Sequence, residues 1–297
     1  QIQIRRQERT MSNVGFIGLG AMGEPMVANL LKNGHSVNIL GTRSPGPVGR
    51  LKELGASVFQ SPSAAAEGCS VAVLALPTST EVEEVVTGEH GLAAGMETGS
   101  VVVDCTTGDP TVTRALGERL NKSGVGMVDA GLTRGVAGAK NGKLAYFVGG
   151  EVDDFEKAKP VLEAMGNTFF MIGGIGTGHE AKIISNILSY GTVALVNEAL
   201  MLGRSFGLDL EKLQEALMAG AMSKALEAFG PTIIAGNFDT PRVSIKNAGI
   251  HMSLIKKLAE KDNTPLYVMP AAGEVYQLAS ERGDDEKDMA VISEIWT

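Results

Sequence analysis

A lysine and an asparagine at helical spacing carry the clearest chemistry in the sequence. Lys182, Ser185 and Asn186 stand in an apolar segment expected to form a long helix from His179 to Phe206. Their spacing places the three side chains on one helix face. A partly buried lysine has a lowered pKa, so it can exchange a proton with a carbonyl oxygen, and its ammonium form stabilises an alkoxide. The competing interpretation is a surface lysine on an amphipathic helix.

A glycine turn near the start of the chain predicts a dinucleotide site. Gly18, Gly20 and Gly23 follow the apolar run 14–17 in the G-x-G-x-x-G spacing and open a helical pattern. Such glycines permit a tight turn, close approach of a pyrophosphate and close helix packing, and the helix N–H groups favour phosphates. A turn without a ligand is the plainer alternative. The expected cofactor contacts are Gly18, Leu19, Gly20, Ala21, Met22 and Gly23.

The segment after the second expected strand, 36–40, indicates which cofactor is used. An acidic residue there would bind the ribose hydroxyls of NAD and repel a 2′-phosphate. The chain instead has Thr42, Arg43 and Ser44, and a guanidinium suits a phosphate. We therefore expect NADP(H) to be preferred, with NAD(H) as the alternative. The other interpretation of Arg43 is a solvated loop arginine.

Composition narrows the classes of function. The 297 residues carry a net charge of −8 and no basic stripe, which argues against a nucleic-acid partner. No apolar run reaches the roughly 20 residues that span a bilayer, so no membrane partner is expected. Two cysteines cannot form a disulfide framework, which favours a cytoplasmic location. We expect no metal, because no cluster of ligands accompanies His179 and Glu180. Residues 1–10 are interpreted as a non-native or disordered leader.

Hydrophobic periodicity predicts two domains. Strand and helix patterns alternate over 11–175, which is typical of an α/β, Rossmann-type doubly wound domain that binds a dinucleotide. Residues 176–297 show only helical patterns and are expected to form an all-α substrate and dimerisation domain. The long helix would join the two. Apolar helices in the second domain suggest a homodimer or homotetramer.

Several of these segments resemble the β-hydroxyacid dehydrogenase family, which includes 3-hydroxyisobutyrate dehydrogenase. The glycine turn, read from Gly18 through Met22, Met26 and Asn29, is similar to the N-terminal signature of that family. The run GHEAKIISN, residues 178–186, resembles its Gly-x-x-x-Lys-x-x-Asn-Asn pattern. The resemblance implies that Lys182 is the catalytic lysine and Asn186 orients the substrate, whereas Ser185 replaces the first asparagine.

The same resemblance assigns further binding residues. Leu76 and Pro77 match a segment beside the cofactor, and Thr107 matches a threonine near the nicotinamide. Thr133 and the N–H groups near Gly135 match the group that holds the substrate carboxylate. A lysine of the second domain lies near the cofactor in the family, and Lys246 is the nearest match. The alternatives are a strand-ending proline at Pro77 and a different register at Lys246.

One departure from the family pattern bears on the substrate. Arg134 stands where the family has glycine, and Gly131 stands where it has proline. An arginine beside a carboxylate site would hold a larger anion or a second anionic group, a sulfonate or a carboxylate. The resemblance adds that sulfolactaldehyde reductase, in the same family, has an arginine at the matching position for its sulfonate. An arginine turned to solvent is the alternative.

The resemblance thus implies an NAD(P)-dependent oxidoreductase that interconverts a short 3-hydroxy acid and its semialdehyde by hydride transfer. Lys182 would act as general acid and base. The alternative from another class is a catalytically silent NADP-binding partner or sensor module. Imine reduction is disfavoured, because relatives with that activity usually lack the lysine.

Overall fold

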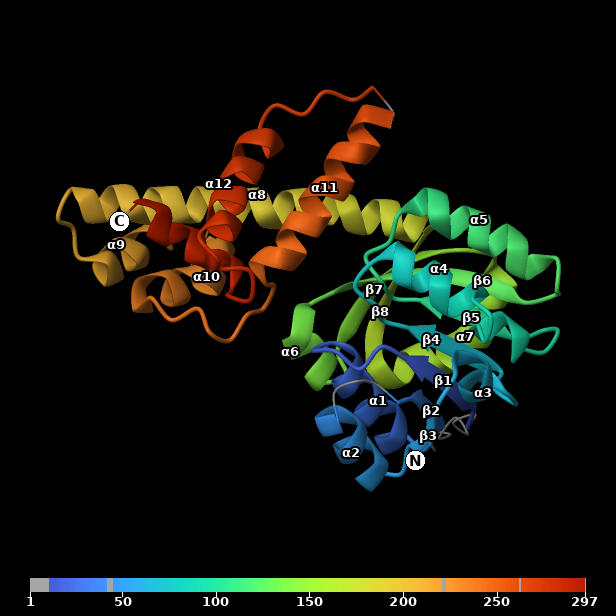
Figure 1. The fold of residues 1–297 in the computed structure, drawn as a ribbon. Helices are drawn as coiled ribbons and strands as arrows, with labels where there is room; N and C mark the ends of the chain where they lie inside the picture. Colours follow the sequence, from blue (N-terminus) through green and yellow to red (C-terminus); the bar gives the residue numbers. More distant parts are fainter. Residues whose placement is uncertain (1–10, 42–44, 221–222, 262, 297) are drawn as a thin grey trace, which may run out of the picture. The chain divides into compact units, whose positions relative to one another are not determined.

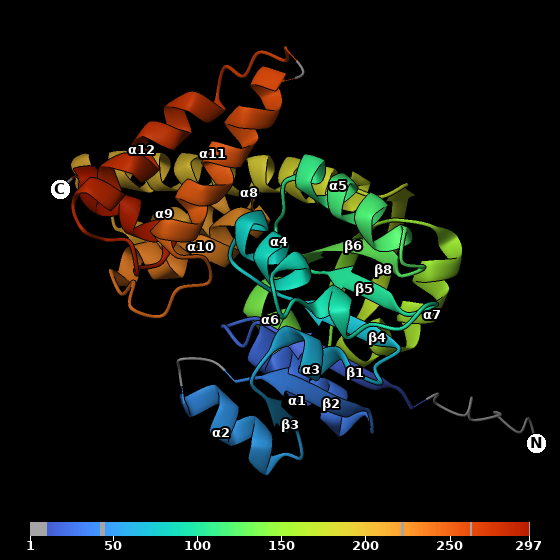
Figure 2. The same ribbon diagram turned by 45° about the vertical axis from the view of Figure 1, so that its right-hand side comes forward.

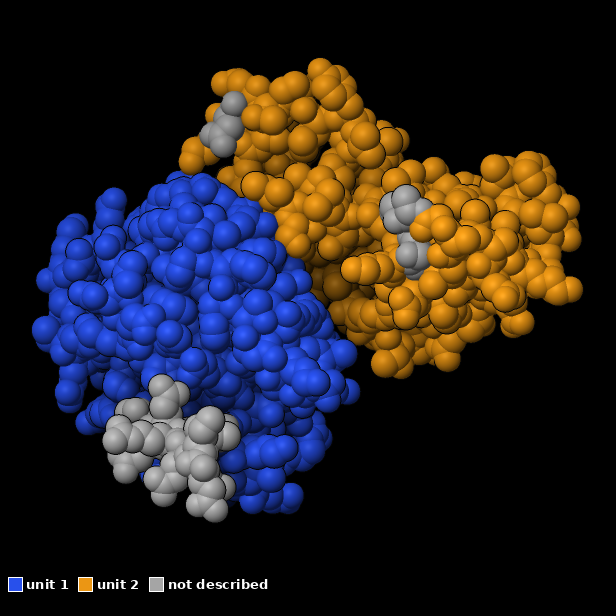
Figure 3. Space-filling model, turned by 180° about the vertical axis from the view of Figure 1, so that it is seen from behind, with its two compact units in different colours: residues 1–182 blue, residues 183–297 orange. Residues whose placement is uncertain are grey.

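The computed structural model describes residues 11–41, 45–220, 223–261 and 263–296. The expected leader, residues 1–10, lies outside the described residues. The chain divides into two compact units, Gln1–Lys182 and Ile183–Thr297 (Figure 3).

The first unit is built on one eight-stranded sheet. Its strand order is β3-β2-β1-β4-β5-β6-β7-β8. All neighbouring strands pair in parallel except β6 and β7, which pair antiparallel. The order reverses at β1, so the sheet has the topological switch point of a doubly wound fold. The strands are β1 (Asn13–Ile17), β2 (Ser36–Leu40), β3 (Ser57–Phe59), β4 (Val71–Leu74), β5 (Val101–Asp104), β6 (Gly126–Thr133), β7 (Leu144–Gly149) and β8 (Gly166–Gly173).

Helices cover both faces of this sheet, because side chains that alternate along each strand are buried on both sides. Phe16 belongs to the core under α1, α2, α6 and α7, whereas Ile17 belongs to the core under α3, α4 and α5 (Figure 1). The helices are α1 (Gly23–Lys32), α2 (Pro45–Glu53), α3 (Pro62–Ala66), α4 (Ser79–Thr87), α5 (Pro110–Asn121), α6 (Gly135–Lys140) and α7 (Val152–Met165), with a 3₁₀ turn, η1 (Leu92–Ala94). The Rossmann-type expectation is confirmed.

The second unit is helical throughout its described part, as expected. Helix α8 (Thr177–Ser205) begins in the first unit and continues into the second. Buried residues of α8, including Tyr190, Val193 and Leu200, form one core with the helices that follow. Figure 2 shows these helices beside α8. These are α9 (Leu210–Leu217), α10 (Ser223–Ala235), α11 (Ile245–Lys261), α12 (Met269–Glu281) and a 3₁₀ segment, η2 (Met289–Trp296).

Two strands have ends that local packing explains. Strand β4 ends at Leu74 although the apolar run continues to Leu76, because the N–H of Leu76 turns to the Thr106 hydroxyl, 3.2 Å away, instead of a neighbouring strand. Strand β6 continues to Thr133, since its second half pairs with β7. Because of this pairing, β6 extends as far as the predicted substrate loop.

Candidate active site

The glycine turn has the geometry that a dinucleotide requires. Gly18 has a φ of 105°, and a β-carbon there would overlap the carbonyl oxygen of Ala75. A β-carbon on Gly23 would overlap the carbonyl oxygen of Gly18. Gly20 differs from both, because nothing lies within 4 Å of its β-carbon position and the residue is exposed. The turn is therefore closed on the protein side and open at Gly20, where a pyrophosphate would approach.

The start of α1 is also suited to a phosphate. Its first residues follow Met22, which provides no side-chain cap for the helix N–H groups. Leu19 is buried beneath the turn, whereas Ala21 is exposed. Uncapped N–H groups and the helix dipole favour an anion at this end. The residues present thus fit the pyrophosphate of a nicotinamide dinucleotide.

Two further predicted cofactor segments follow β4, which neighbours β1, and β5, which neighbours β4. Leu76 and Pro77 follow β4, and Thr107 follows β5. The side chain of Thr106 accepts the N–H of Leu76, and Asp104 Oδ1 accepts the N–H of Thr106 at 2.9 Å. These bonds join the two loops at the carboxyl edge of the sheet. The topology therefore brings three of the predicted segments to the same edge, at the switch point where ligands bind in such sheets.

The residues expected to select NADP(H), Thr42, Arg43 and Ser44, lie outside the described residues. Only the start of that loop is described, where Gly41 donates its N–H to the carbonyl of Phe59 at 2.8 Å. The preference for NADP(H) stays a prediction.

The predicted catalytic lysine is half-buried, with its stem packed against the backbone of β6. A β-carbon on Gly131 would lie 2.6 Å from the β-carbon of Lys182 and 3.2 Å from the carbonyl oxygen of Gly178. Burial lowers the pKa of Lys182 to about 8, because desolvation disfavours the charged form. At neutral pH this ammonium is still mostly protonated, yet it can lose its proton readily. Lys182 therefore suits proton transfer, and its catalytic role stays a prediction.

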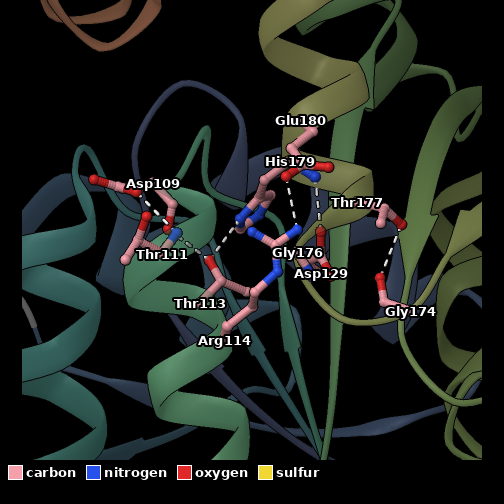
Figure 4. Close-up of polar contacts among 10 residues, drawn as sticks. All are labelled: Asp109, Thr111, Thr113, Arg114, Asp129, Gly174, Gly176, Thr177, His179 and Glu180. Carbon is pink, nitrogen blue, oxygen red and sulfur yellow. Dashed lines mark hydrogen bonds and ion pairs between the residues drawn. The ribbon is translucent and has the colours of Figure 1, made fainter. Parts of the chain in front are cut away.

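A buried carboxylate fixes the start of α8. Asp129 accepts the backbone N–H of Gly176 on Oδ1 and that of His179 on Oδ2, both at 2.7 Å (Figure 4). His179 lies in the first turn of α8, where N–H groups have no partner within the helix, and Gly176 directly precedes the helix. A β-carbon on Gly178 would overlap the carbonyl oxygen of Phe147. The first turn of α8 is thus tied to β6 and pressed against β7, three to six residues before Lys182.

His179 adds a second anchor. Its side chain is fully buried, and Nε2 lies 3.3 Å from the carbonyl of Asp104, to which it donates. Its Nδ1 shares a 2.9 Å hydrogen bond with the hydroxyl of Thr113 on α5. On the surface, Arg114 pairs with Glu180 at 2.7 Å. Sequence reasoning placed His179 and Glu180 only near the helix cap and gave Asp129 no role. The one available signal was a lone aspartate inside an apolar strand, since such a carboxylate needs donors.

Asn186 follows Lys182 by one helical turn on α8. Its side chain is 3% exposed, and its Nδ2 has no hydrogen-bond partner among the described residues. A buried amide without a partner is unfavourable unless a ligand supplies an acceptor. This orphaned donor is the feature expected of a substrate-orienting asparagine.

The predicted substrate loop stands at the end of β6. Thr133 is the last residue of the strand and is half-buried, and Arg134 and Gly135 follow with φ values of 75° and 56°. The left-handed conformation explains why glycine suits position 134 in the family pattern, because other residues are strained there. Gly135 begins the short helix α6, whose presence the sequence analysis did not predict.

The side chain of Arg134 is exposed and contacts neutral groups. Its Nη1 donates to the carbonyl of Lys143 at 3.0 Å and to Asn167 Oδ1 at 2.9 Å, and Nη2 donates to Thr168 Oγ1 at 3.1 Å. In the described part of the chain no carboxylate pairs with this guanidinium. Arg134 therefore holds the loop to β7 and β8 while its charge stays available to an anion.

Lys246 lies in the second unit, in the first turn of α11. Its backbone N–H donates to the carbonyl of Asp285 at 3.0 Å. The residue lines a cavity of about 1230 Å³ formed by α11, α12 and the chain between them. Its predicted contact with the cofactor stays a prediction. Among the described residues, no group of three His, Cys, Asp or Glu side chains could hold a metal ion.

Comparison with known proteins identifies the family to which this chain is similar. Residues 13–173 match the family of the NAD-binding domain of 6-phosphogluconate dehydrogenase, and residues 176–296 match the family described as NAD-binding of NADP-dependent 3-hydroxyisobutyrate dehydrogenase. The chain belongs to the β-hydroxyacid dehydrogenase family. It is therefore an oxidoreductase of the 3-hydroxyisobutyrate dehydrogenase and 6-phosphogluconate dehydrogenase-like group.

Individual members of the family show how far the likeness extends. Mitochondrial 3-hydroxyisobutyrate dehydrogenase of Mus musculus is 32% identical over 97% of this chain and 88% of its own length. NAD-dependent L-serine dehydrogenase of Pseudomonas aeruginosa is 32% identical over 96% and 98%. The structure of 3-hydroxyisobutyrate dehydrogenase from Salmonella typhimurium has a TM-score of 0.87 at 24% identity and covers 96% and 99%, which shows the shared fold. The relatives support NAD(P)-dependent dehydrogenase activity on a small hydroxy acid.

Proposed function

We propose that this protein interconverts a short 3-hydroxy acid and its semialdehyde, with NADP(H) preferred over NAD(H). The observation that carries the proposal is the half-buried Lys182, whose β-carbon lies against Gly131 two residues before Thr133. This places a proton donor beside the loop that the family pattern assigns to the substrate carboxylate. A cytoplasmic location and assembly as a homodimer or homotetramer are part of the same proposal.

Each of the predicted site residues has a separate role in this mechanism. The nicotinamide supplies or accepts the hydride when it is bound. Thr133 and the nearby N–H groups bind the carboxylate, and Asn186 uses its unpartnered Nδ2 to orient the reacting oxygen. In the direction of reduction, Lys182 donates a proton from Nζ to that oxygen, and its charge stabilises the alkoxide before transfer. In the direction of oxidation, neutral Lys182 accepts the proton.

The experiment is a turnover assay with NADPH and NADH over a panel of aldehyde acids, for the wild type and Lys182→Ala. We expect the variant to lose at least 100-fold in kcat, in keeping with general acid–base catalysis, and to retain NADPH binding. Lys122→Ala, at the exposed end of α5, is the matched control and should keep full activity. Full turnover by Lys182→Ala would contradict the mechanism. Tight NADPH binding with no turnover of any aldehyde would instead favour a catalytically silent module.

Arg134 indicates the class of substrate that we propose for this protein. Because no carboxylate neutralises this guanidinium in the described chain, it can pair with a second anionic group, a sulfonate or a carboxylate. We expect Arg134→Lys to lower kcat/KM by at least tenfold for a semialdehyde with two carboxylates, and likewise for sulfolactaldehyde, whose one anionic group is a sulfonate, since an ammonium lacks the planar fork. Methylmalonate semialdehyde with one free carboxylate is the reference substrate. An equal loss of kcat/KM on all substrates would show that Arg134 affects catalysis only by holding the loop in place.

A further inference from the structure

The buried side chain of His179 joins two segments that the sequence assigns to different parts of the site. His179 lies in the first turn of α8, three residues before Lys182. Its Nε2 donates to the carbonyl of Asp104, the last residue of β5, at 3.3 Å. Residues 105–109, which we call the β5–α5 loop, include Thr107, the residue expected beside the nicotinamide. One imidazole therefore connects the lysine helix to the strand that leads into this loop.

The β5–α5 loop also packs directly on the ring. A β-carbon on Gly108 would stand 2.8 Å from both Cε1 and Nδ1 of His179, closer than β-carbons come to other atoms. Gly108 therefore leaves the space that the imidazole fills. The side chain of His179 is 0% exposed, and protein interiors are close-packed. A displacement of the loop must then either move the ring or open a cavity.

Hydrogen bonds hold His179 in one position. A carbonyl oxygen only accepts, so Nε2 carries the proton that Asp104 accepts. Its Nδ1 shares a 2.9 Å hydrogen bond with the hydroxyl of Thr113, which also lies 3.0 Å from the carbonyl of Asp109 at the end of the loop (Figure 4). The backbone N–H of His179 donates to Asp129 Oδ2 at 2.7 Å. Because its ring and its backbone are both bonded, a shift of the loop acts on the start of α8.

The β5–α5 loop is bonded in turn to the predicted cofactor segment after β4. The hydroxyl of Thr106 accepts the N–H of Leu76 at 3.2 Å, and the hydroxyl of Ser79 accepts the N–H of Asp109 at 2.6 Å. These two bonds hold the two loops together. The contact of His179 with one loop is therefore a link to both of the predicted cofactor segments.

Reduction of an aldehyde requires the lysine and the nicotinamide side of the site to keep a fixed separation. A hydride must reach the carbonyl carbon and a proton must reach the carbonyl oxygen, and these two atoms are only about 1.2 Å apart. The hydride is expected on the side of Thr107, and the proton is expected from Nζ of Lys182. A misplacement of about 1 Å can lower the rate of such a reaction by about 100-fold.

We propose that His179 is a positioning residue, which sets the place of Lys182 relative to the β5–α5 loop through its bond to Asp104 and its contact with Gly108. Because the side chain is fully buried, it acts through Lys182 and not on the substrate. The effect on the rate rests on the proposed function, whereas the physical link between the loop and α8 does not.

Two substitutions separate the bond to Asp104 from the bulk of the side chain. The amide in His179→Gln lies near the place of Nε2 and can still donate to Asp104, whereas the shorter amide in His179→Asn lies near Nδ1 and reaches only Thr113. We expect His179→Asn to lose at least tenfold in kcat, with KM and the Kd for NADPH within about twofold of the wild type. His179→Gln should retain kcat within about threefold.

Arg114→Ala is the matched control for these variants. The ion pair of Arg114 with Glu180, at 2.7 Å, also joins α5 to α8 but lies on the surface, where such a pair contributes little. This variant should keep full kcat. Wild-type kcat in folded His179→Asn, or equal losses in His179→Asn and His179→Gln, would overturn the inference.

Amide hydrogen exchange tests the link without turnover. The dinucleotide that binds more tightly, NADPH or NADH, should slow exchange in the wild type both in the β5–α5 loop and in residues 176–182. In His179→Asn it should slow exchange in the loop alone. Gly108→Ala should behave in the same way, because its methyl group displaces the ring. Protection of residues 176–182 in His179→Asn, or its absence in the wild type, would overturn the inference.

Failure of this inference can be told apart from failure of the proposed function. If the wild type turns over no aldehyde acid, the proposed function fails, and the exchange measurement still decides the link because it needs only a bound dinucleotide. If the wild type is active and folded His179→Asn is equally active, the inference alone fails. Circular dichroism checks that each variant folds.

Discussion

Lys182 lies directly over Gly131, so closely that a β-carbon on the glycine would stand 2.6 Å from the lysine's own β-carbon. Real β-carbons are not found at such a separation, and the lysine stem is therefore positioned by the absence of a side chain on β6. The family pattern has proline at position 131, so the close approach belongs to this chain and not to the pattern as a whole.

Gly131→Ala should therefore displace the lysine. We expect kcat to fall at least tenfold and the free energy of unfolding to fall by about 1–3 kcal/mol, because the added methyl group overpacks the site. Gly273→Ala on α12 is the matched control, since nothing lies within 4 Å of its β-carbon position. It should keep full activity and gain up to about 1 kcal/mol. Wild-type kcat in Gly131→Ala would contradict the contact.

The lowered pKa of Lys182 predicts opposite pH profiles in the two directions. With a pKa of about 8, the lysine is neutral above this pH, so hydroxy-acid oxidation should rise with pH through about 8. Aldehyde reduction needs the ammonium and should fall over the same range. Initial rates in both directions between pH 6 and pH 10 check this expectation, and profiles that move in the same direction would exclude Lys182 as the titrating group.

The same shift predicts a stability effect. The pKa of Lys182 is about 8 in the folded chain and has the ordinary lysine value of 10.5 in the unfolded chain, so between these limits the unfolded chain binds more protons. Stability should then rise as pH rises from about 8 to 10.5. Below pH 8 Lys182 is protonated in both states, and its partly desolvated charge lowers the free energy of unfolding by on the order of 1–3 kcal/mol. Lys182→Met should accordingly raise Tm at pH 7 while it abolishes turnover, and a lower Tm would show that the lysine is well solvated.

Asp129 should act on the reaction through the position of α8. Asp129→Asn replaces one acceptor oxygen by an amide group, so one of the two N–H groups of Gly176 and His179 loses its partner. We expect a loss of about 1–3 kcal/mol in the free energy of unfolding.

Kinetics separate this positioning role from a purely structural one. If the start of α8 moves, kcat should fall more than KM changes, and the midpoint of the pH–rate profile should shift with Lys182. Asp153→Asn, an exposed acid in the first turn of α7, is the control. An unchanged kcat and pH profile in folded Asp129→Asn would mean that the carboxylate serves stability alone.

Two glycines of the cofactor turn should respond differently to alanine. Gly18→Ala should unfold the protein or lower Tm strongly, because φ is 105° and the new methyl group overlaps the Ala75 carbonyl. Gly20→Ala has open space around it and should leave Tm nearly unchanged. Its methyl group would instead meet the pyrophosphate. Titration of the folded variant with NADPH should show at least a tenfold weaker Kd, and an unchanged Kd would place the dinucleotide elsewhere.

Backbone strain at Arg134 can be measured with a pair of variants. Arg134→Ala and Arg134→Gly both remove the bonds to Lys143, Asn167 and Thr168. Only glycine relieves the left-handed conformation at φ 75°. We therefore expect the glycine variant to be more stable than the alanine variant by about 1 kcal/mol in urea unfolding. Equal stabilities would indicate that the loop changes its conformation when the side chain is removed.

The sequence by itself determined those features of this protein that depend on residues close together along the chain. The strand, glycine turn and helix from Val14 to Leu30, and the spacing of Lys182 and Asn186, are local patterns, so they predicted the Rossmann-type unit and the helix that bears the lysine. The family signature was readable for the same reason, because it consists of short runs.

Only the tertiary structure decided what surrounds the lysine. Asp129 lies 47 residues before Gly176, and its bond to that N–H depends on the order and direction of β6 and β7. The contact of Gly131 with Lys182 and the left-handed conformation of Arg134 have the same origin. Such relationships arise when distant segments pack together, and no local pattern of hydrophobicity or spacing records them. The sequence names the lysine that we propose as the proton donor, whereas packing determines where that lysine is held.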